Sequence, residues 1–195
     1  MDHVKKRIVV AATGASGLPI LKMCLQIIRE DSDYESILVM SDSAKLTLRQ
    51  ETGDTVEEIE ALADQVCDAK NIGAGPASGS YRTEGMLIVP CSMKTVAGIH
   101  SGYADNLILR AADVTIKEQR TLVLAVRETP LSAIHLRNMS ELAMIPGIRI
   151  IPPMMTFYHQ PETIEEMMYH IAAKLVEPFG IEAKEYRRWT GLSEK

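Results

Sequence analysis

The stretch Arg7-Ile-Val-Val-Ala-Ala-Thr-Gly-Ala-Ser-Gly-Leu-Pro-Ile20 decides the fold, because an apolar run leads through a turn of small residues into a helical pattern. Residues 7–12 have the length of a strand, and apolar residues at helical spacing continue over residues 18–29. Glycine and serine between the two segments allow a tight turn. The stretch is the first unit of an alternation of strands and helices, which predicts a parallel sheet covered on both faces.

The alternation continues along the chain. Further strands are expected at residues 36–40, 86–89, 122–126 and 148–151. Helices are expected at residues 44–51, 55–66, 106–118, 132–144 and 163–176, with a loop at residues 73–80. Five strands with interleaved helices predict an α/β fold with a three-layer, doubly wound parallel sheet, which is flavodoxin-like or Rossmann-like.

Length and composition limit the possible functions. A chain of 195 residues suits one hydrophobic core, so we expect a single domain over residues 1–195. A net charge of −5 without a Lys/Arg-rich block argues against nucleic acid as a partner. No apolar run approaches the roughly 18 residues of a membrane span, and no signal-peptide pattern is present. Three cysteines without CxxC spacing and histidines without paired spacing argue against disulfides and metal binding. We expect a cytoplasmic protein without a metal or a membrane partner.

Polar motifs follow the ends of the predicted strands, where ligands of open parallel sheets bind. After the first strand, Gly14, Ala15 and Ser16 supply a tight turn, a hydroxyl and a helix N-terminus, all suited to an anion. A turn in which Ser16 only caps the helix explains the same residues. Ser41 follows the second strand, where its hydroxyl could reach a cofactor or cap the next helix, as could that of Ser43.

Two more polar segments follow later strands. Ser92-Met-Lys-Thr95 offers two hydroxyls and an ammonium group directly before a helix, whose unpaired amides could bind further acceptors. Arg127 and Glu128 follow the strand at residues 122–126, and an ion pair between them is the default interpretation.

Three other features could belong to a site. Arg110 lies in an apolar helical stretch and needs an anionic partner if it is buried. Lys117, seven residues later, shares its helical face, and a solvated face is the alternative for this lysine. Residues 152–159 form a rigid apolar loop with aromatic residues, which suits the enclosure of a hydrophobic substrate.

The order of these motifs resembles that of the UbiX-type flavin prenyltransferases, which include small B subunits of phenolic acid decarboxylase systems. The matching segments are Thr13-Gly-Ala-Ser-Gly17, the Ser-Met-x-Thr loop at residues 92–95, residues 97–99, 102–107 and 110–113, and Arg127-Glu-Thr-Pro-Leu131. The resemblance implies transfer of a dimethylallyl group from dimethylallyl (mono)phosphate to N5 and C6 of reduced FMN, without a metal. The product, prenylated FMN, would serve a UbiD-type decarboxylase. A homo-oligomer, a dodecamer with sites between subunits, is implied as well.

The resemblance also assigns residues to roles. It implies that Ser16, Glu51 and Glu128 are catalytic. The residues implied to bind FMN are Gly14, Ala15, Ser16, Ser41, Ser92, Met93, Lys94, Thr95 and Arg127. The residues implied to bind the substrate are Arg110, Lys117, Tyr158, Lys174 and Trp189. The residues alone would make Glu51 a surface residue of a helix and Trp189 part of the core.

Two alternatives come from other classes of protein. One is a flavin-dependent decarboxylase of the phosphopantothenoylcysteine type, which has a similar Gly-x-Ala-Asp-Asn-Leu segment. Against it, this chain has no cysteine in its last hundred residues to act as the catalytic thiol. The other is a flavin-binding accessory subunit of a phenolic acid decarboxylase, with no transferase activity of its own.

Overall fold

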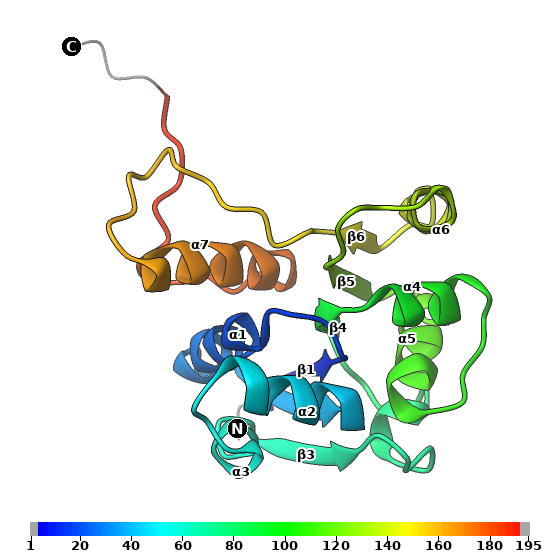
Figure 1. The fold of residues 1–195 in the computed structure, drawn as a ribbon. Coiled ribbons are helices and arrows are strands. Elements are labelled where there is room, and N and C mark those ends of the chain that lie inside the picture. The colour runs from blue at the N-terminus through cyan, green and yellow to red at the C-terminus, as the bar shows by residue number, and fades with distance from the viewer. Residues whose placement is uncertain (1–3, 192–195) are drawn as a thin grey trace.

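The computed structural model describes residues 4–191, in which a six-stranded parallel sheet lies between layers of helices (Figure 1). The strand order is β3-β2-β1-β4-β5-β6. The elements in chain order are β1 (Lys6–Ala12), α1 (Leu18–Glu30), β2 (Tyr34–Met40), α2 (Asp42–Glu51), α3 (Val56–Glu60), β3 (Gln65–Asp68), η1 (Gly75–Ala77), β4 (Gly85–Cys91), α4 (Met93–His100), α5 (Leu107–Lys117), β5 (Thr121–Val126), α6 (Ala133–Ala143), β6 (Ile148–Ile150), α7 (Ile164–Val176) and η2 (Glu177–Phe179). The predicted doubly wound sheet is confirmed. Residues 1–3 and 192–195 of the predicted domain lie outside the described residues.

Alternate residues of the central strand β1 enter two separate cores, because successive side chains of a strand point to opposite faces of the sheet. Val10 belongs to the core beneath α1, α2 and α7. Val9 belongs to the core beneath α4 and α5. All seven residues of β4 are buried, as expected of a strand that is covered on both faces. The sheet is therefore a rigid support for the loops at its carboxyl edge.

The prediction of one long helix at residues 55–66 is wrong. Helix α3 ends at Glu60, and after a turn the chain forms strand β3, which pairs with β2 at the edge of the sheet. The carboxylate of Asp64 fixes this turn, because its Oδ2 accepts hydrogen bonds from the amide of Ser36 at 2.8 Å and from its hydroxyl at 3.3 Å. The sheet consequently has six strands within the described residues, where the sequence predicts five.

Helix α4 also differs from the prediction, because Ser92-Met-Lys-Thr95 does not precede a helix but begins one. Ser92 is the N-cap, and residues 93–95 form the first turn. Asn106 caps α5, so the helix predicted at residues 106–118 is confirmed. None of the helices within residues 4–191 combines the length and the apolar character that are needed to cross a bilayer.

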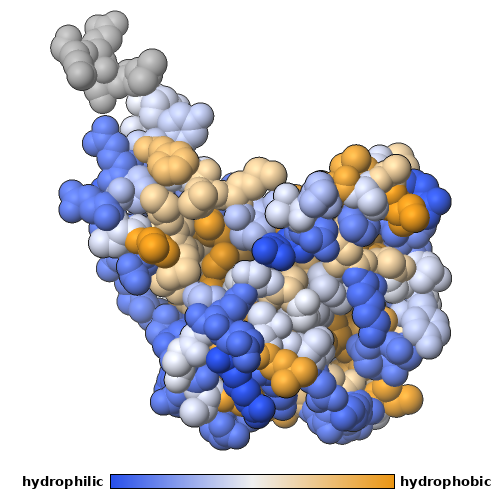
Figure 2. All heavy atoms as spheres, in the orientation of Figure 1, coloured by the Kyte–Doolittle hydropathy of each residue, from blue (hydrophilic) through white to orange (hydrophobic). Residues whose placement is uncertain are grey.

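The last part of the chain leaves the body of the molecule. Residues 152–163 and 181–191, which we name the C-terminal arm, flank α7 and extend beyond it (Figure 1). Several large apolar side chains of the arm are exposed, such as Met154 and Phe157, and so are Ile134 and Leu136 of α6. Figure 2 shows hydrophobic surface over α6 and beside α7. Trp189 is 60% exposed, so the expectation from the residues alone that it fills the core is wrong.

Candidate active site

Polar loops meet at the carboxyl edge of the sheet, around the point between β1 and β4 where the order of the strands reverses. Thr13 joins two of these loops, because its hydroxyl donates to the carbonyl of Pro90 at 2.9 Å and accepts from the amide of Ser92 at 2.8 Å. The amide of Arg127 donates to the carbonyl of Cys91 at 3.1 Å, which adds the loop after β5. Hydrogen bonds thus hold the loops after β1, β4 and β5 in fixed positions relative to one another.

The loop after β2 is attached on the other side. The amide of Ser41 donates to the carbonyl of Ala12 at 3.0 Å. A Cβ atom at Gly14 would lie 2.6 Å from both the Cβ and the Oγ of Ser43, so the two loops approach closely only because residue 14 is a glycine. The hydroxyl of Ser41 accepts from the amide of Ala44 at 3.1 Å, which confirms the capping interpretation for this serine.

Three helices, α1, α2 and α4, begin at these loops. Their first amides carry partial positive charge, and hydroxyl groups lie beside them. The hydroxyl of Ser92 caps α4 and lies 3.1 Å from the hydroxyl of Thr95. Helix N-termini with neighbouring hydroxyls form a site for a phosphate group.

Glu51, at the end of α2, reaches across to the start of α1. Its Oε2 accepts from the amide of Gly17 at 2.9 Å and from the amide of Leu18 at 3.0 Å. The N-cap of α1 is Gly17, and no side chain of the turn itself caps the helix. The capping interpretation for Ser16 is therefore wrong, and its side chain is exposed at the edge of the site.

Arg127 and Glu128 are both exposed after the end of β5. The Oε1 atom of Glu128 accepts from the amide of Thr129 at 3.0 Å. Within the described part of the chain no ion pair joins Arg127 to Glu128, so the default interpretation of this dipeptide is wrong. The charged groups of Arg127 and Glu128 are therefore not neutralised by each other.

Arg110 and Lys117 lie on α5, which starts at the carboxyl edge and runs about 16 Å toward the amino edge. Arg110 is partly exposed, and its guanidinium donates to Asp113 at 2.5 Å and to the carbonyl of Ala77 at 3.2 Å. The anionic partner expected for a buried Arg110 is thus Asp113. Lys117, near the amino edge, pairs with Glu118. The structure does not bring Lys117 to the loops at the carboxyl edge of its own chain.

The C-terminal arm carries a second group of polar and aromatic side chains. The rings of Tyr158 and Trp189 lie 5.3 Å apart, between centroids, at an interplanar angle of 56°. Lys174 of α7 donates to Glu177 at 2.5 Å. Lys174 also lines a pocket of about 200 Å³ whose other lining residues are Ile151, Pro152, Met154, Thr156, His170, Ile171 and Tyr186. The arm and α7 together therefore combine a cation with an apolar cavity.

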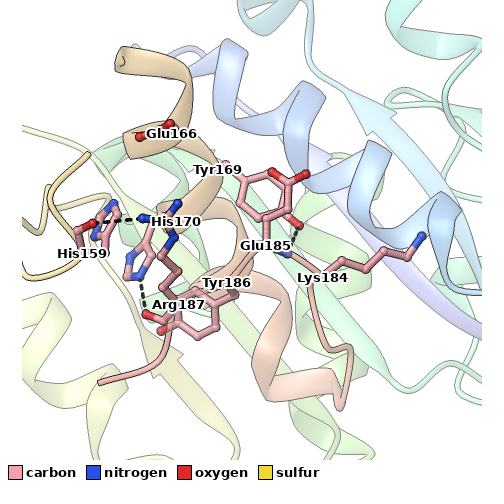
Figure 3. A pocket seen from close by; sticks show the side chains of 8 residues that line it. All are labelled: His159, Glu166, Tyr169, His170, Lys184, Glu185, Tyr186 and Arg187. Carbon is pink, nitrogen blue, oxygen red and sulfur yellow. Dashed lines mark hydrogen bonds between the residues drawn. The ribbon is translucent and has the colours of Figure 1, made fainter. Parts of the chain in front are cut away.

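Two stacked histidines connect the two segments of the arm to α7 (Figure 3). The rings of His159 and His170 lie 4.0 Å apart at an angle of 7°. His170 also contacts the hydroxyl of Thr156 through Nδ1 at 3.1 Å and the carbonyl of Arg187 through Nε2 at 3.2 Å. Both ring nitrogens of His159 are buried without a hydrogen-bond partner. Desolvation, with smaller contributions from His170 and Arg187, lowers the pKa of His159.

Comparison with known proteins places this geometry in a family. A family model described as Flavoprotein matches residues 1–176. The flavin prenyltransferase LpdB of Lactiplantibacillus plantarum is 50% identical over 186 residues, which are 95% of this chain and 99% of the relative. The chain belongs to the UbiX-like flavin prenyltransferases. The resemblance that the motifs predicted is confirmed.

Solved structures of UbiX-like proteins share the fold. A dodecameric FMN-dependent UbiX-like decarboxylase from Escherichia coli O157:H7 matches with a TM-score of 0.92 and 46% identity, over 95% of this chain and 100% of that chain. AnUbiX (PadA1), in complex with FMN and dimethylallyl pyrophosphate, matches with a TM-score of 0.94 and 43% identity, over 97% of this chain and 100% of that chain. The predicted class, a doubly wound parallel sheet, is thus shared with UbiX structures.

The residues that the UbiX resemblance singles out fall into three places. At the carboxyl edge lie Gly14, Ala15, Ser16, Ser41, Glu51, Ser92, Met93, Lys94, Thr95, Arg127 and Glu128. On the arm and the neighbouring α7 lie Tyr158, Lys174 and Trp189. Arg110 and Lys117 lie on α5, and their charges are taken up by Asp113 and Glu118.

Several contacts of the site were missed at the level of sequence. Thr13 holds two loops together, and its position directly after a strand and before Gly14 is the signal that could have found it. Glu177 pairs with Lys174, and the spacing of three residues between them at the end of a helix could have predicted this ion pair. The stack of His159 on His170 has no sequence signal, because it depends on how the arm folds back on α7.

Proposed function

We propose that this protein transfers a dimethylallyl group from dimethylallyl phosphate to N5 and C6 of reduced FMN, with release of phosphate and prenylated FMN. The observation that carries the proposal is the set of joined loops at the carboxyl edge, where helix N-termini, hydroxyls and the carboxylate of Glu51 surround one site. The AnUbiX structure, which holds FMN and dimethylallyl pyrophosphate, supports this choice of substrates.

The residues present fit FMN. A single phosphate monoester needs several N–H and O–H donors, and the N-terminus of α4 with the hydroxyls of Ser92 and Thr95 supplies them. Gly14 allows the close approach of two loops that form the wall of this site. Ala15, Ser16, Ser41, Met93 and Lys94 complete the residues that would contact the flavin. When bound, reduced FMN supplies the nucleophilic positions N5 and C6.

The exposed charges after β5 would serve the reaction itself. Arg127 would contact the flavin, and Glu128, free of an ion pair with Arg127, would carry a proton between the donor side and the flavin. Glu51, held by two backbone amides, and the exposed hydroxyl of Ser16 would hold or move a proton at N5. These roles rest on positions at one edge of the sheet.

The donor must lose its phosphate, so the C–O bond to the dimethylallyl carbon breaks and its electron pair leaves with the phosphate. Lys174 and the hydroxyl of Tyr158 would hold this phosphate, and the faces of Tyr158 and Trp189 would stabilise positive charge on the allylic carbons. Protein cations thus take the part that a metal ion plays in other phosphate departures, and we propose a metal-independent transferase.

The site is proposed to be completed by other copies of the chain, in a homo-oligomer that we take to be a dodecamer. Within one chain, Lys117 lies at the far end of α5 from the carboxyl edge and pairs with Glu118, whereas the phosphate needs further cations. The arm and α6 expose Met154, Phe157 and Ile134 by 61–71%, which is apolar surface of the kind that subunits cover. Arg110 and Lys117 would then reach the donor bound by a neighbouring copy. The dodecameric UbiX-like protein supports this arrangement.

The product would be consumed elsewhere. Prenylated FMN is a cofactor and not an end product, so we propose that a UbiD-type decarboxylase in the cytoplasm receives it. The proposal involves neither nucleic acid nor a membrane.

One experiment tests the proposed reaction. Reduced FMN is incubated anaerobically with the protein and dimethylallyl monophosphate, and in parallel with the pyrophosphate, and the mass of the released flavin is measured. We expect an increase of one isoprene unit, and none when the donor is omitted. Unchanged FMN with both donors would overturn the proposal and favour a flavin-binding accessory subunit. A decarboxylase of the phosphopantothenoylcysteine type is disfavoured, because Cys91 is the last cysteine of the chain.

A further inference from the structure

Glu177 bridges two cations that come from different segments. It directly follows α7, and its Oε2 accepts from the ammonium of Lys174 at 2.5 Å. Its other oxygen, Oε1, accepts from the guanidinium of Arg188 in the C-terminal arm. The side chain of Glu177 is 24% exposed, whereas Lys174 and Arg188 are exposed by 54% and 52%. One half-buried carboxylate therefore holds two accessible cations beside each other.

Contacts other than the ion pair with Glu177 also hold Arg188 in place. Its guanidinium lies over the ring of Tyr186, 5.2 Å from the centroid. The next residue is Trp189, which packs on Tyr158. Tyr158, Arg188 and Trp189 line one pocket of about 410 Å³. Arg188 is thus fixed on both sides and faces the cavity of the two aromatic rings.

The cavity that Arg188 lines adjoins the cavity that Lys174 lines. Both have Thr156, His170 and Tyr186 in their walls. An anion that entered from the side of Tyr158 and Trp189 would therefore meet both cations. The one acceptor that these cations share in the described structure is the carboxylate of Glu177.

A carboxylate that accepts hydrogen bonds from a lysine and an arginine satisfies the same donors that a phosphate would. Each of its oxygens takes one charge-assisted hydrogen bond, as two oxygens of a phosphate would. Two cations and one carboxylate leave a net charge of about +1, which a phosphate dianion more than balances. Hydrogen bonding from Lys174, with a further contribution from Arg188, lowers the pKa of Glu177, so the bridge is ionised at neutral pH.

We propose that Arg188 is a further cation of the donor-phosphate subsite, beside Lys174 of the same chain, and that Glu177 is its positioning residue, whose carboxylate holds Lys174 and Arg188 together until the phosphate displaces it. The inference rests on the proposed function. It adds a residue from the arm to the subsite, and it makes the docking of Trp189 sensitive to the phosphate.

The first test measures phosphate without catalysis. Trp189 is the only tryptophan of the chain, so its fluorescence reports on the arm while inorganic phosphate is titrated into the FMN-bound protein. Arg188→Gln should weaken phosphate binding roughly tenfold, and Arg188→Lys should recover part of the loss. Lys184→Gln is the matched control, because Lys184 loses the same charge in the same segment but pairs with Glu30. Equal affinities for Arg188→Gln and Lys184→Gln would overturn the proposal.

Glu177→Gln distinguishes a carboxylate that the phosphate displaces from one that only supports the structure. The amide keeps the size of the side chain but removes the competing negative charge, so phosphate should bind several-fold more tightly. Glu162→Gln, an exposed change of equal charge in the arm, should leave the affinity unchanged. Weaker phosphate binding in Glu177→Gln would show that the carboxylate helps to hold the phosphate in place. The proposal that the phosphate displaces this carboxylate would then be overturned.

Turnover distinguishes this inference from the proposed function. Arg188→Gln should raise the KM for dimethylallyl monophosphate about tenfold, with a smaller change in kcat and unchanged affinity for FMN. If wild-type protein leaves the mass of FMN unchanged, the proposed function has failed. If wild-type protein prenylates FMN but Arg188→Gln has the KM of Lys184→Gln, only the role of Arg188 has failed.

Discussion

The carboxyl edge of the sheet and the C-terminal arm are built on opposite principles. At the edge, buried Thr13 and a chain of hydrogen bonds fix the loops, and the strands beneath them are fully covered. In the arm, Tyr158 is 79% and Trp189 60% exposed, and the segments are held mainly by stacked rings and ion pairs. Under the proposed function, one chain would preform the flavin end of the site, whereas the donor end would need a ligand or another copy to complete it.

The strongest test of this division is Glu128→Gln at the edge. The amide keeps the shape of the side chain but loses proton transfer, so prenylated flavin should form about 10²- to 10⁴-fold more slowly. FMN affinity should stay within a few-fold of the wild type, because the amide oxygen of glutamine can still accept the hydrogen bond from Thr129. Single-turnover kinetics with reduced FMN and dimethylallyl monophosphate measure the rate.

Glu57→Gln, an exposed change on α3, serves as the control for Glu128→Gln. An unchanged rate in Glu128→Gln would remove this carboxylate from the mechanism. Loss of FMN binding in the same variant would show that Glu128 supports the loop instead, and the edge would then be less preformed than the hydrogen bonds indicate.

Substitutions in the body and in the arm should also differ in their effect on the free energy of unfolding. Leu38 of β2 is fully buried, and Leu38→Ala should lower the free energy of unfolding by about 2–5 kcal/mol at any protein concentration. Met155 of the arm is 62% exposed, and Met155→Ala should cost less than about 0.5 kcal/mol where the chain is monomeric. Urea denaturation at several protein concentrations measures both.

A concentration-dependent loss of stability in Met155→Ala would sharpen the comparison, because it would show that other copies cover the arm. A large loss in the monomer would contradict the view of the arm as a loosely held segment.

The sequence was informative about the body because its signals are local. Apolar runs and a cap such as Ser41 predicted most helices and strands, and the ends of the strands predicted where polar loops would meet. Strand β3 escaped because Gln65–Asp68 is short and half polar, and it forms only where Asp64 bonds to Ser36 on the neighbouring strand.

The site was predictable to the extent that it depends on topology. Ser92 and Thr95 could be placed from the strand they follow. Glu51 could not, because its bonds to Gly17 and Leu18 span more than thirty positions of the chain, and only the resemblance to a family singled it out. The arm was the least predictable part, since ring stacking between distant segments leaves no periodic pattern.

Two substitutions test the donor end. Lys174→Ala should weaken binding of dimethylallyl monophosphate by about 1.5–3 kcal/mol, or ten- to a hundredfold, because it removes a charged contact. Tyr158→Phe should have a smaller effect, since it removes only a neutral hydroxyl. Isothermal titration with the donor and with FMN measures the two affinities. Loss of FMN affinity with donor binding intact would show that the two subsites had been assigned in reverse.

The smallest expected effect is a dependence of the arm on pH. His159 stacks on His170 and faces Arg187, Glu166 and Tyr186. Its pKa is lower in the folded protein than its ordinary value near 6.5, chiefly through desolvation. Below about pH 6.5 the undocked arm therefore binds more protons than the docked arm, so docking weakens as the pH falls through this window and is fully favoured above it.

The fluorescence of Trp189 between pH 7.5 and 5.5 measures this weakening, because the ring leaves Tyr158 when the arm undocks. His159→Phe keeps an aromatic ring for the stack but cannot be protonated, so it should abolish the pH dependence of docking. His100→Gln, a change on α4 where His100 contacts Glu141, should preserve it. The change in the docking equilibrium should be smaller than the roughly tenfold effect of Lys174→Ala on donor affinity, since His159 makes only one of several contacts that hold the arm. The same pH dependence in His159→Phe as in the wild type would show that His159 does not control the docking of the arm.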